Sequence, residues 1–149
     1  TKGEGIIHHS FEDYYEFKGE ISHRTSGALI AFEPGEASAY ALDSIQDRGE
    51  LFIVPGTKVY AGMIVGEHNK DDDIEVNVCR KKHLTNMRAA GSDDAIRLSP
   101  PRLFSLEQAM EYVEDDELVE ITPESIRMRK KILDRHERAK AMKSITNRK

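Results

Sequence analysis

Turn-forming residues divide the first half of this chain into short segments. Glu33-Pro34-Gly35 and Pro55-Gly56 are the clearest turns, and turn signals recur about every ten residues up to Asn69. The apolar runs between them, such as Gly27–Phe32 and Gly62–Glu67, are too short for core helices and have the length of strands. Short strands at this regular spacing predict a mostly antiparallel β body, barrel-like or sandwich-like in form.

Two segments have the spacing of helices instead. Leu106–Val113 has apolar residues at 106, 109, 110 and 113, which form one stripe of an amphipathic helix, and Ser105 is a suitable N-cap. Leu42–Arg48 is predicted to be a second helix that ends at Gly49. Further strands are predicted at Thr1–Phe17 (a strand or hairpin), Ala37–Ala41, Leu51–Val54, Ile74–Val78, Ala95–Leu98, Leu118–Ile121 and near Ile126. A basic C-terminal helix is predicted to follow, so the fold class is α+β with two or three helices.

The composition is that of a charge-rich domain with enough apolar residues for a core. Hydrophobic residues make up 38% of the 149 residues and charged residues 33%. The longest apolar run has about five residues, whereas a membrane-spanning helix needs about 20. Cys79 is the only cysteine, so no internal disulfide can form, which favours a reducing compartment and predicts a cytoplasmic protein. We interpret Cys79 as a structural residue, although its basic neighbours could lower the pKa of its thiol.

A basic segment interrupts this otherwise acidic chain. The formal net charge is -5, yet Asn77–Gly91 (NVCRKKHLTNMRAAG) contains no Asp or Glu. The residues of this segment that we single out for RNA contact are Arg80, Lys81, Lys82, Thr85, Asn86 and Arg88. A concentrated positive charge on an acidic background attracts a polyanion, and the segment has no aromatic residue on which bases could stack. It therefore predicts a loop that contacts RNA phosphates. The alternative is that the loop only keeps the protein soluble.

The C-terminal segment has a second excess of positive charge. Residues 127–149 contain ten Lys or Arg against Asp134 and Glu137, a net charge of +8, which leaves -13 for the rest of the chain. Such an asymmetry between body and tail suggests a basic arm that binds an acidic partner. The first basic residues of this arm, which are also predicted to contact RNA, are Arg127, Arg129, Lys130 and Lys131.

Three other patterns are weaker. Asn69-Lys70-Asp71-Asp72 matches the N-K-x-D signature with which GTPases read guanine, but the chain has no glycine-rich phosphate loop, so we prefer a solvated turn. Asp71-Asp72-Asp73 with His68 could hold a hard cation, yet the spacing of a calcium loop is missing. The adjacent side chains of His8-His9 point to opposite sides of a strand. We predict no metal, no cofactor and no catalytic residue in this chain.

Several longer strings occur together in one order. They are QDRG at 46–49, ELFIVPGTKVYAGMIVGEH at 50–68, LTNMRAAGSDDAIRLSPPR at 84–102 and SLEQAMEYVEDDELVEITPESIRMRKKIL at 105–133. This order closely resembles the C-terminal region of the TypA/BipA family of translational GTPases, from about residue 22 to the tail. Residues 1–21 resemble the closing strands of the preceding domain, which is similar to the fifth domain of elongation factor G. The resemblance therefore divides the chain into 1–21 and a family-specific domain at 22–149.

The resemblance implies a ribosome-associated GTPase with roles in ribosome assembly and stress adaptation. Its GTP- and magnesium-binding domain would lie upstream of this chain. It also implies that the long loop, Asn77–Asp94 here, reaches along the acceptor arm of a transfer RNA in the ribosomal A site. The RNA-binding residues carried over by position are Lys81, Lys82, Thr85, Asn86 and Arg88, whereas Cys79 and Arg80 occupy positions at which the family varies.

We therefore expect a domain that binds the ribosome through ribosomal and transfer RNA. We expect it to be no enzyme by itself, to bind neither GTP nor a membrane, and to be a monomer. The alternative is a protein-interaction module in which the acidic body meets the partner. A metal-dependent hydrolase that uses Asp71–Asp73 is a third and weaker possibility.

Overall fold

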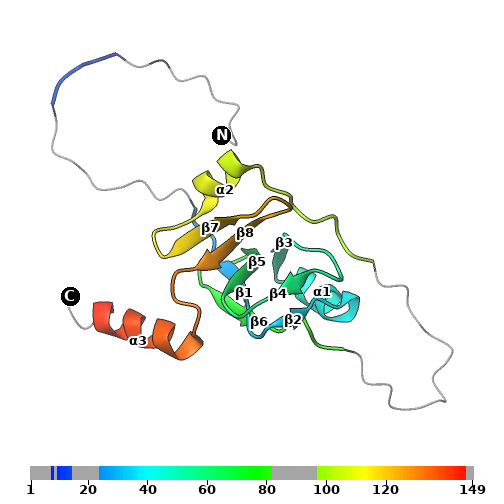
Figure 1. The fold of residues 1–149 in the computed structure, drawn as a ribbon. Helices are drawn as coiled ribbons and strands as arrows, with labels where there is room; N and C mark the ends of the chain where they lie inside the picture. The colour runs from blue at the N-terminus through cyan, green and yellow to red at the C-terminus, as the bar shows by residue number, and fades with distance from the viewer. Residues whose placement is uncertain (1–7, 9, 15–23, 82–96, 147–149) are drawn as a thin grey trace, which may run out of the picture.

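The body of the protein is a six-stranded sheet with a helix packed against each face (Figure 1). The computed structural model describes residues 8, 10–14, 24–81 and 97–146. The strands of this sheet are β1 (Ala28–Ala31), β3 (Gly49–Leu51), β5 (Met63–His68), β6 (Ile74–Val76), β7 (Glu117–Ile121) and β8 (Ile126–Lys130). The helices are α1 (Ala39–Gln46), α2 (Leu106–Tyr112) and α3 (Arg135–Thr146), and β2 (Gly35–Glu36) pairs with β4 (Lys58–Val59) in a small second sheet.

The strand order confirms the predicted α+β class and its mostly antiparallel body. The order is β6-β1-β5-β8-β7, and β3 also pairs with β5. Only the β1–β6 pair is parallel among the pairs of the described residues. The sheet is open, with β6 and β7 at its ends, so its strands do not close into a barrel. The predicted barrel-like or sandwich-like form fits the structure only loosely.

β5 is the central strand and separates two hydrophobic cores. Alternate residues of a strand face opposite sides of a sheet. Met63 and Val65 accordingly lie in a cluster with the buried side of α1, whereas Ile64 lies in a cluster with Ala109 and Tyr112 of α2. The period-two pattern of β5 therefore fixes which helix covers which face.

α1 begins earlier than predicted. Ser38 has an extended backbone, and its hydroxyl oxygen accepts a hydrogen bond from the Ala41 amide at 3.1 Å, which makes it the N-cap. The predicted strand at Ala37–Ala41 is therefore wrong: the cap turns the chain directly into the helix that was predicted for Leu42–Arg48. The strand-like composition was outweighed by this one local hydrogen bond.

Gly49 does not end α1, as predicted, but begins β3. The helix ends at Gln46 with Asp47 as its C-cap. A Cβ atom added at Gly49 would lie 1.8 Å from the carbonyl oxygen of Glu67, in the neighbouring strand β5. Glycine is required here because the two backbones approach too closely for any side chain.

Most elements of the second half are confirmed. Ser105 caps α2 in a capping box with Gln108, as its position before the apolar stripe predicted. β6, β7, β8 and α3 also lie where strands and a basic helix were predicted. Of the predicted strand Leu51–Val54 only Leu51 lies in a strand. Residues 97 and 98 lie in no strand, and the rest of that predicted strand is outside the described residues.

The predicted strand or hairpin at Thr1–Phe17 is not formed at residues 8 and 10–14, which are the described part of it. A strand exists only through hydrogen bonds to a neighbour, and the Tyr14 amide donates to the adjacent Asp13 side chain instead.

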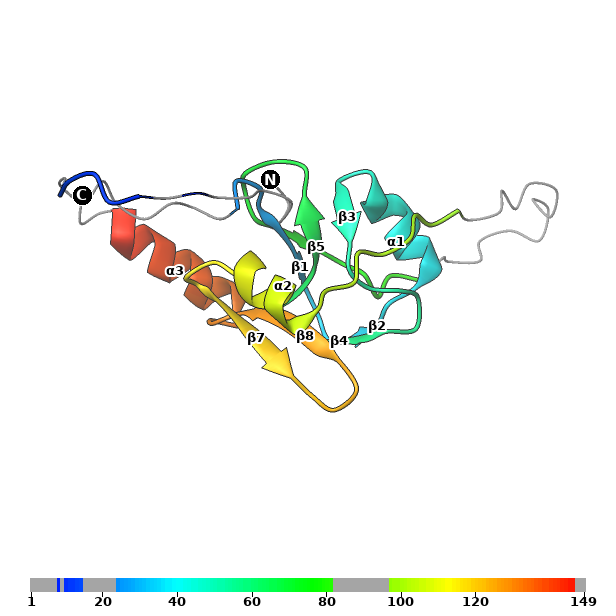
Figure 2. The same ribbon diagram turned by 90° about the horizontal axis from the view of Figure 1, so that it is seen from above.

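α3 lies beyond the body, at the opposite end from α1 in both views (Figures 1 and 2). Its first turn is fixed by Glu75 of β6, whose carboxylate contacts Arg138 at 2.5 Å and Arg135 at 3.3 Å. Asp134 accepts hydrogen bonds from the His136 and Glu137 amides and so caps the helix start. Across the described ranges, no helix is both long and apolar enough to cross a membrane.

Candidate nucleic-acid interface

The basic loop leaves the body at the N-terminal end of α1. Val78, two residues after β6, is buried, and its carbonyl oxygen accepts a hydrogen bond from the Ser38 amide at 2.9 Å. The Ser38 hydroxyl donates to the carbonyl oxygen of Arg80 at 2.5 Å. Asn77 donates to the Glu33 carboxylate and accepts from the Cys79 amide. Ser38 therefore both caps α1 and holds the outgoing stem of the loop.

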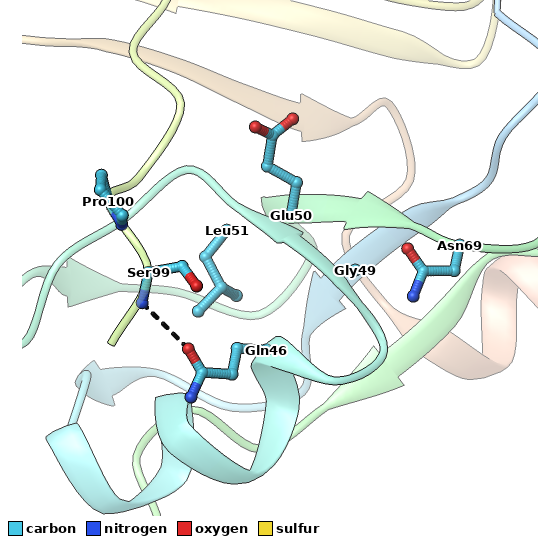
Figure 3. Close-up of a pocket in the computed structure, with 7 residues that line it drawn as sticks. All are labelled: Gln46, Gly49, Glu50, Leu51, Asn69, Ser99 and Pro100. Carbon is cyan, nitrogen blue, oxygen red and sulfur yellow. Dashed lines mark hydrogen bonds between the residues drawn. The ribbon is translucent and has the colours of Figure 1, made fainter. Parts of the chain in front are cut away.

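The loop returns at the other end of the same helix. Gln46, the last residue of α1, donates from Nε2 to the carbonyl oxygen of Arg97 at 3.0 Å. Its Oε1 accepts from the Ser99 amide at 3.0 Å (Figure 3). The Arg102 amide then donates to the carbonyl oxygen of Leu51 in β3. An eight-residue helix is about 12 Å long at about 1.5 Å per residue, and α1 thus holds both stems of the loop at its two ends.

The Gln46→Ala variant should loosen the return stem and leave the fold intact. It removes the two hydrogen bonds to residues 97 and 99, each worth about 0.5–1.5 kcal/mol, from an exposed site. We expect the Ser99 amide to exchange its hydrogen at least several-fold faster, while amides of β5 keep their protection. Unchanged exchange at Ser99 would show that Gln46 does not hold the stem.

The predicted interface is described only at its root. Arg80 and Lys81 are exposed, and neither forms an ion pair with another described residue. Their charges are therefore directed to solvent rather than folded back onto the acidic body. The other predicted loop residues lie outside the described residues, namely Lys82, Thr85, Asn86 and Arg88.

Lys130 is the clearest difference from the predicted arm. Its ammonium group lies 2.6 Å from Asp73, 3.0 Å from Asp116 and 2.9 Å from Glu117, and its side chain is 3% exposed. Glu117 is itself fully buried and receives two hydrogen bonds from Arg24, at 2.8 and 3.1 Å. A phosphate cannot reach an ammonium group that is enclosed in this way, so we remove Lys130 from the interface.

The pKa of Lys130 reflects its contacts with the surrounding carboxylates. Burial alone would lower the pKa of an ammonium group. The hydrogen bonds to Asp73 and Glu117, together with the attraction of Glu117, outweigh burial and raise the pKa above its ordinary value. The ammonium group therefore stays charged, and its charge is used inside the protein.

The other basic residues of the predicted arm differ in availability. Arg129 contacts Glu120 at 2.8 Å, so its charge is paired. Lys131 is exposed and donates to the backbone oxygen of Asp115, and Arg127 is half-buried; neither has a carboxylate partner among the described residues. Charge counting along the sequence missed these differences because it does not show partners.

The acidic run with His68, and Cys79, make contacts inside the fold. Asp73 accepts a hydrogen bond from the Ala28 amide as well as pairing with Lys130, and His68 contacts the backbone oxygen of Asp72 at 2.6 Å. No three His, Cys, Asp or Glu side chains of the described ranges are placed to hold a metal ion. Burial, followed by the nearby Glu33 carboxylate, raises the pKa of the Cys79 thiol, which suits the predicted structural role.

Ser38 and Gln46 hold the two stems of the loop, and sequence reasoning missed both. The signal for Ser38 was available, because serine before a helical run is a typical N-cap. Nothing in the sequence connects Gln46 to residues 97–99, because the contact spans 51 and 53 positions along the chain.

These features define the class: an α+β domain that presents a basic loop from the two ends of one helix. The chain belongs to the TypA/BipA family, because residues 26–135 match its C-terminal domain. The resemblance read from the sequence is thereby confirmed.

Curated relatives share most of this chain. It is 55% identical over 130 residues to the large ribosomal subunit assembly factor BipA of Synechocystis, covering 87% of this chain and 22% of that protein. It is 48% identical over 144 residues to the Bacillus subtilis protein of the same name, with 96% and 24% covered. The Haemophilus influenzae protein is 50% identical over 148 residues, with 99% and 24% covered. This chain thus spans about a quarter of the length of these relatives.

Proposed function

We propose that this domain binds the large ribosomal subunit through the phosphates of ribosomal and transfer RNA. The relatives are named as assembly factors of that subunit. The observation that carries the proposal is the basic loop whose two stems are fixed by Ser38 and Gln46, with the charges of Arg80 and Lys81 exposed at its root. Phosphate contacts made from this loop would give affinity without sequence readout.

The residues have different roles in this proposal. Lys81, Lys82 and Arg88 neutralise phosphates, and Thr85 and Asn86 fix the register by hydrogen bonds. Secondary contacts come from Arg80, Arg127 and Lys131. Arg129 and Lys130 are left out because carboxylates of the body already pair with them.

Several further properties belong to the whole protein. We propose that an upstream domain binds GTP and magnesium, that the loop contacts the acceptor arm of an A-site transfer RNA, and that the protein acts in the cytoplasm as a monomer in ribosome assembly and stress adaptation. The family membership supports these proposals, and the exposed charges at the root of the loop support the contact with transfer RNA. The domain boundary after residue 21 stays a prediction.

Binding of the chain to purified large and small subunits over a series of potassium chloride concentrations tests the proposal. Each neutralised phosphate contributes about 0.7–0.9 to the slope of log K against log salt. We expect preference for the large subunit and a slope of several units. Binding that is insensitive to salt and survives nuclease treatment would instead favour the acidic body as a protein-binding surface.

A further inference from the structure

β7 lies at one end of the six-stranded sheet, so one of its two edges has no neighbouring strand (Figure 1). Its other edge pairs with β8 along all five of its residues. An open strand edge presents backbone N–H and C=O groups to which another strand can add. Lysine and proline discourage such pairing, and β7 has neither. Its two charged residues, Glu117 and Glu120, already pair with Lys130 and Arg129 of β8.

The hydrogen bonds at the two ends of the β7–β8 hairpin show which backbone groups face this edge. The Lys131 amide donates to the carbonyl oxygen of Asp116 at 2.8 Å, and the Thr122 amide donates to that of Ser125 at 2.9 Å. Bonding to the partner alternates along an antiparallel strand. The even-numbered residues of β7 therefore bond to β8, and the backbone groups of the odd-numbered residues face outward.

The outward backbone groups form a row along β7. The amides and carbonyl oxygens of Val119 and Ile121 form no hydrogen bond with another described residue. The Glu117 amide donates to the carbonyl oxygen of Glu114, but the carbonyl oxygen of Glu117 faces the edge. Residues 117, 119 and 121 thus offer two donors and three acceptors, repeated about every 6.8 Å. An added strand has the matching repeat.

The side chains along this edge are apolar at its centre. Val119 packs against the core cluster that contains Ala109 and Tyr112 of α2. Ile121 lies on the same face of the strand and is 64% exposed, and Leu118 on the opposite face is 37% exposed. The apolar surface beneath α2 therefore continues to the edge, where it meets solvent. An added strand with β-branched side chains would bury it.

Carboxylates flank the edge at both ends. Residues 114–124 contain six Asp or Glu and no Lys or Arg. Asp115 precedes β7 and Glu124 follows it; both are exposed, and neither carboxylate pairs with a cation of the described residues. Lys131 reaches only the backbone oxygen of Asp115. The charges therefore favour a segment with Lys or Arg on both sides of its centre.

The same charges disfavour two other occupants. Carboxylates at both ends of the edge would repel the phosphates of RNA. A second copy that paired β7 with β7 would bring the carboxylates of both copies together, and like charges on neighbouring strands are destabilising.

We propose that the β7 edge binds an extended protein segment that has an apolar, β-forming centre and Lys or Arg at both ends. The segment adds a strand to the sheet, bonds to the backbone of Val119 and Ile121, and places its basic side chains beside Asp115 and Glu124. Main-chain hydrogen bonds give the affinity, and the charged ends select the partner. The basic loop leaves the chain after β6, at the other end of the strand order, and the proposal does not depend on RNA binding.

Titration of the full chain with a fluorescent peptide tests this proposal. The peptide has two lysines at each end and five alternating valines and threonines between them, and its matched control carries N-methyl groups on the five central amides. Each backbone hydrogen bond lost weakens binding roughly two- to tenfold, so we expect the control to bind at least roughly tenfold more weakly. No binding of the unmethylated peptide, or equal binding of both, would overturn the proposal.

Variants of the chain test the edge itself. Ile121→Pro removes an outward donor and leaves the bonds to β8 in place, so it should bind the peptide more weakly than Ile121→Val, which keeps the amide. The Asp115→Asn, Glu124→Gln double variant should weaken binding at low salt, whereas Glu36→Gln, an exposed carboxylate on β2, should not. Thermal unfolding checks that each variant is folded. Full affinity in both Ile121→Pro and the double variant would contradict the proposal.

Hydrogen exchange at single amides locates the bound segment. Saturating peptide should slow exchange several-fold at Val119 and Ile121. It should change little at Leu118 and Glu120, whose amides already bond to β8. Protection confined to other strands would overturn the proposal. Protection of Val119 and Ile121 that rises with chain concentration in the absence of peptide would assign the edge to a second copy and would also overturn it.

Discussion

Replacing Glu117 with alanine is expected to lower the free energy of unfolding by about 3–5 kcal/mol. The fully buried carboxylate pairs with Lys130 and receives two hydrogen bonds from Arg24, and Glu114 donates its amide to the same group. Removing it takes from Arg24 and Lys130 the buried carboxylate that pairs with both, which costs more than the pairing itself contributes. Urea denaturation of the chain measures the loss.

The matched control for this prediction is Glu50→Ala. Glu50 is 55% exposed and lies 3.6 Å from Arg102, so its loss should cost less than about 1 kcal/mol. A Glu117→Met, Lys130→Met double variant should recover part of the stability, because it replaces the pair by apolar groups and leaves no unpaired ammonium. If Glu117→Ala cost as little as the control, the buried ion pairs of Glu117 would not stabilise the fold.

The second large effect is expected from a triple substitution in the loop, Lys81→Ala, Lys82→Ala and Arg88→Ala. If each residue neutralises one phosphate, the slope of log K against log salt for ribosome binding should flatten by about two to three units. Affinity at low salt should fall by orders of magnitude, and affinities at high salt should converge. Titration of large subunits at a series of salt concentrations measures both.

A control triple removes the same charge elsewhere. Arg48, Lys58 and Lys70 are exposed and lie outside both the loop and the C-terminal arm, and their alanine variants change the net charge of the chain equally. We expect this control to keep most of the slope. Equal flattening in both triples would mean that overall charge, and not the loop, controls binding.

Elements with strong local signals were predictable. β5 follows from a short apolar run between turn signals, and α2 from its apolar period and the Ser105 cap, because both are set by neighbours within a few residues. The predicted start of α1 is late because Ala37–Ala41 is assigned to a returning strand, whereas Ser38 caps the helix there. Local signals that compete within one segment are the ones that sequence reasoning misjudges.

The positive charge of the candidate site could be predicted from the sequence, but the contacts that hold its stems could not. The loop was visible as a stretch without carboxylates. That Ser38 and Gln46 hold its stems, and that Lys130 is enclosed by carboxylates, depends on contacts between distant positions; Arg24 and Glu117, for example, are 93 residues apart. Only the fold brings these residues together.

Localised cleavage of RNA from two positions on the chain tests the central claim most directly. Because Cys79 is the only cysteine, a Cys79→Ser background allows one iron chelator to be attached at Thr85→Cys in the loop or at Glu124→Cys in the exposed β7–β8 turn. The account predicts strong cleavage of ribosomal or transfer RNA from the loop position and little from the turn. Cleavage from the turn alone, or equally from both positions, would contradict it.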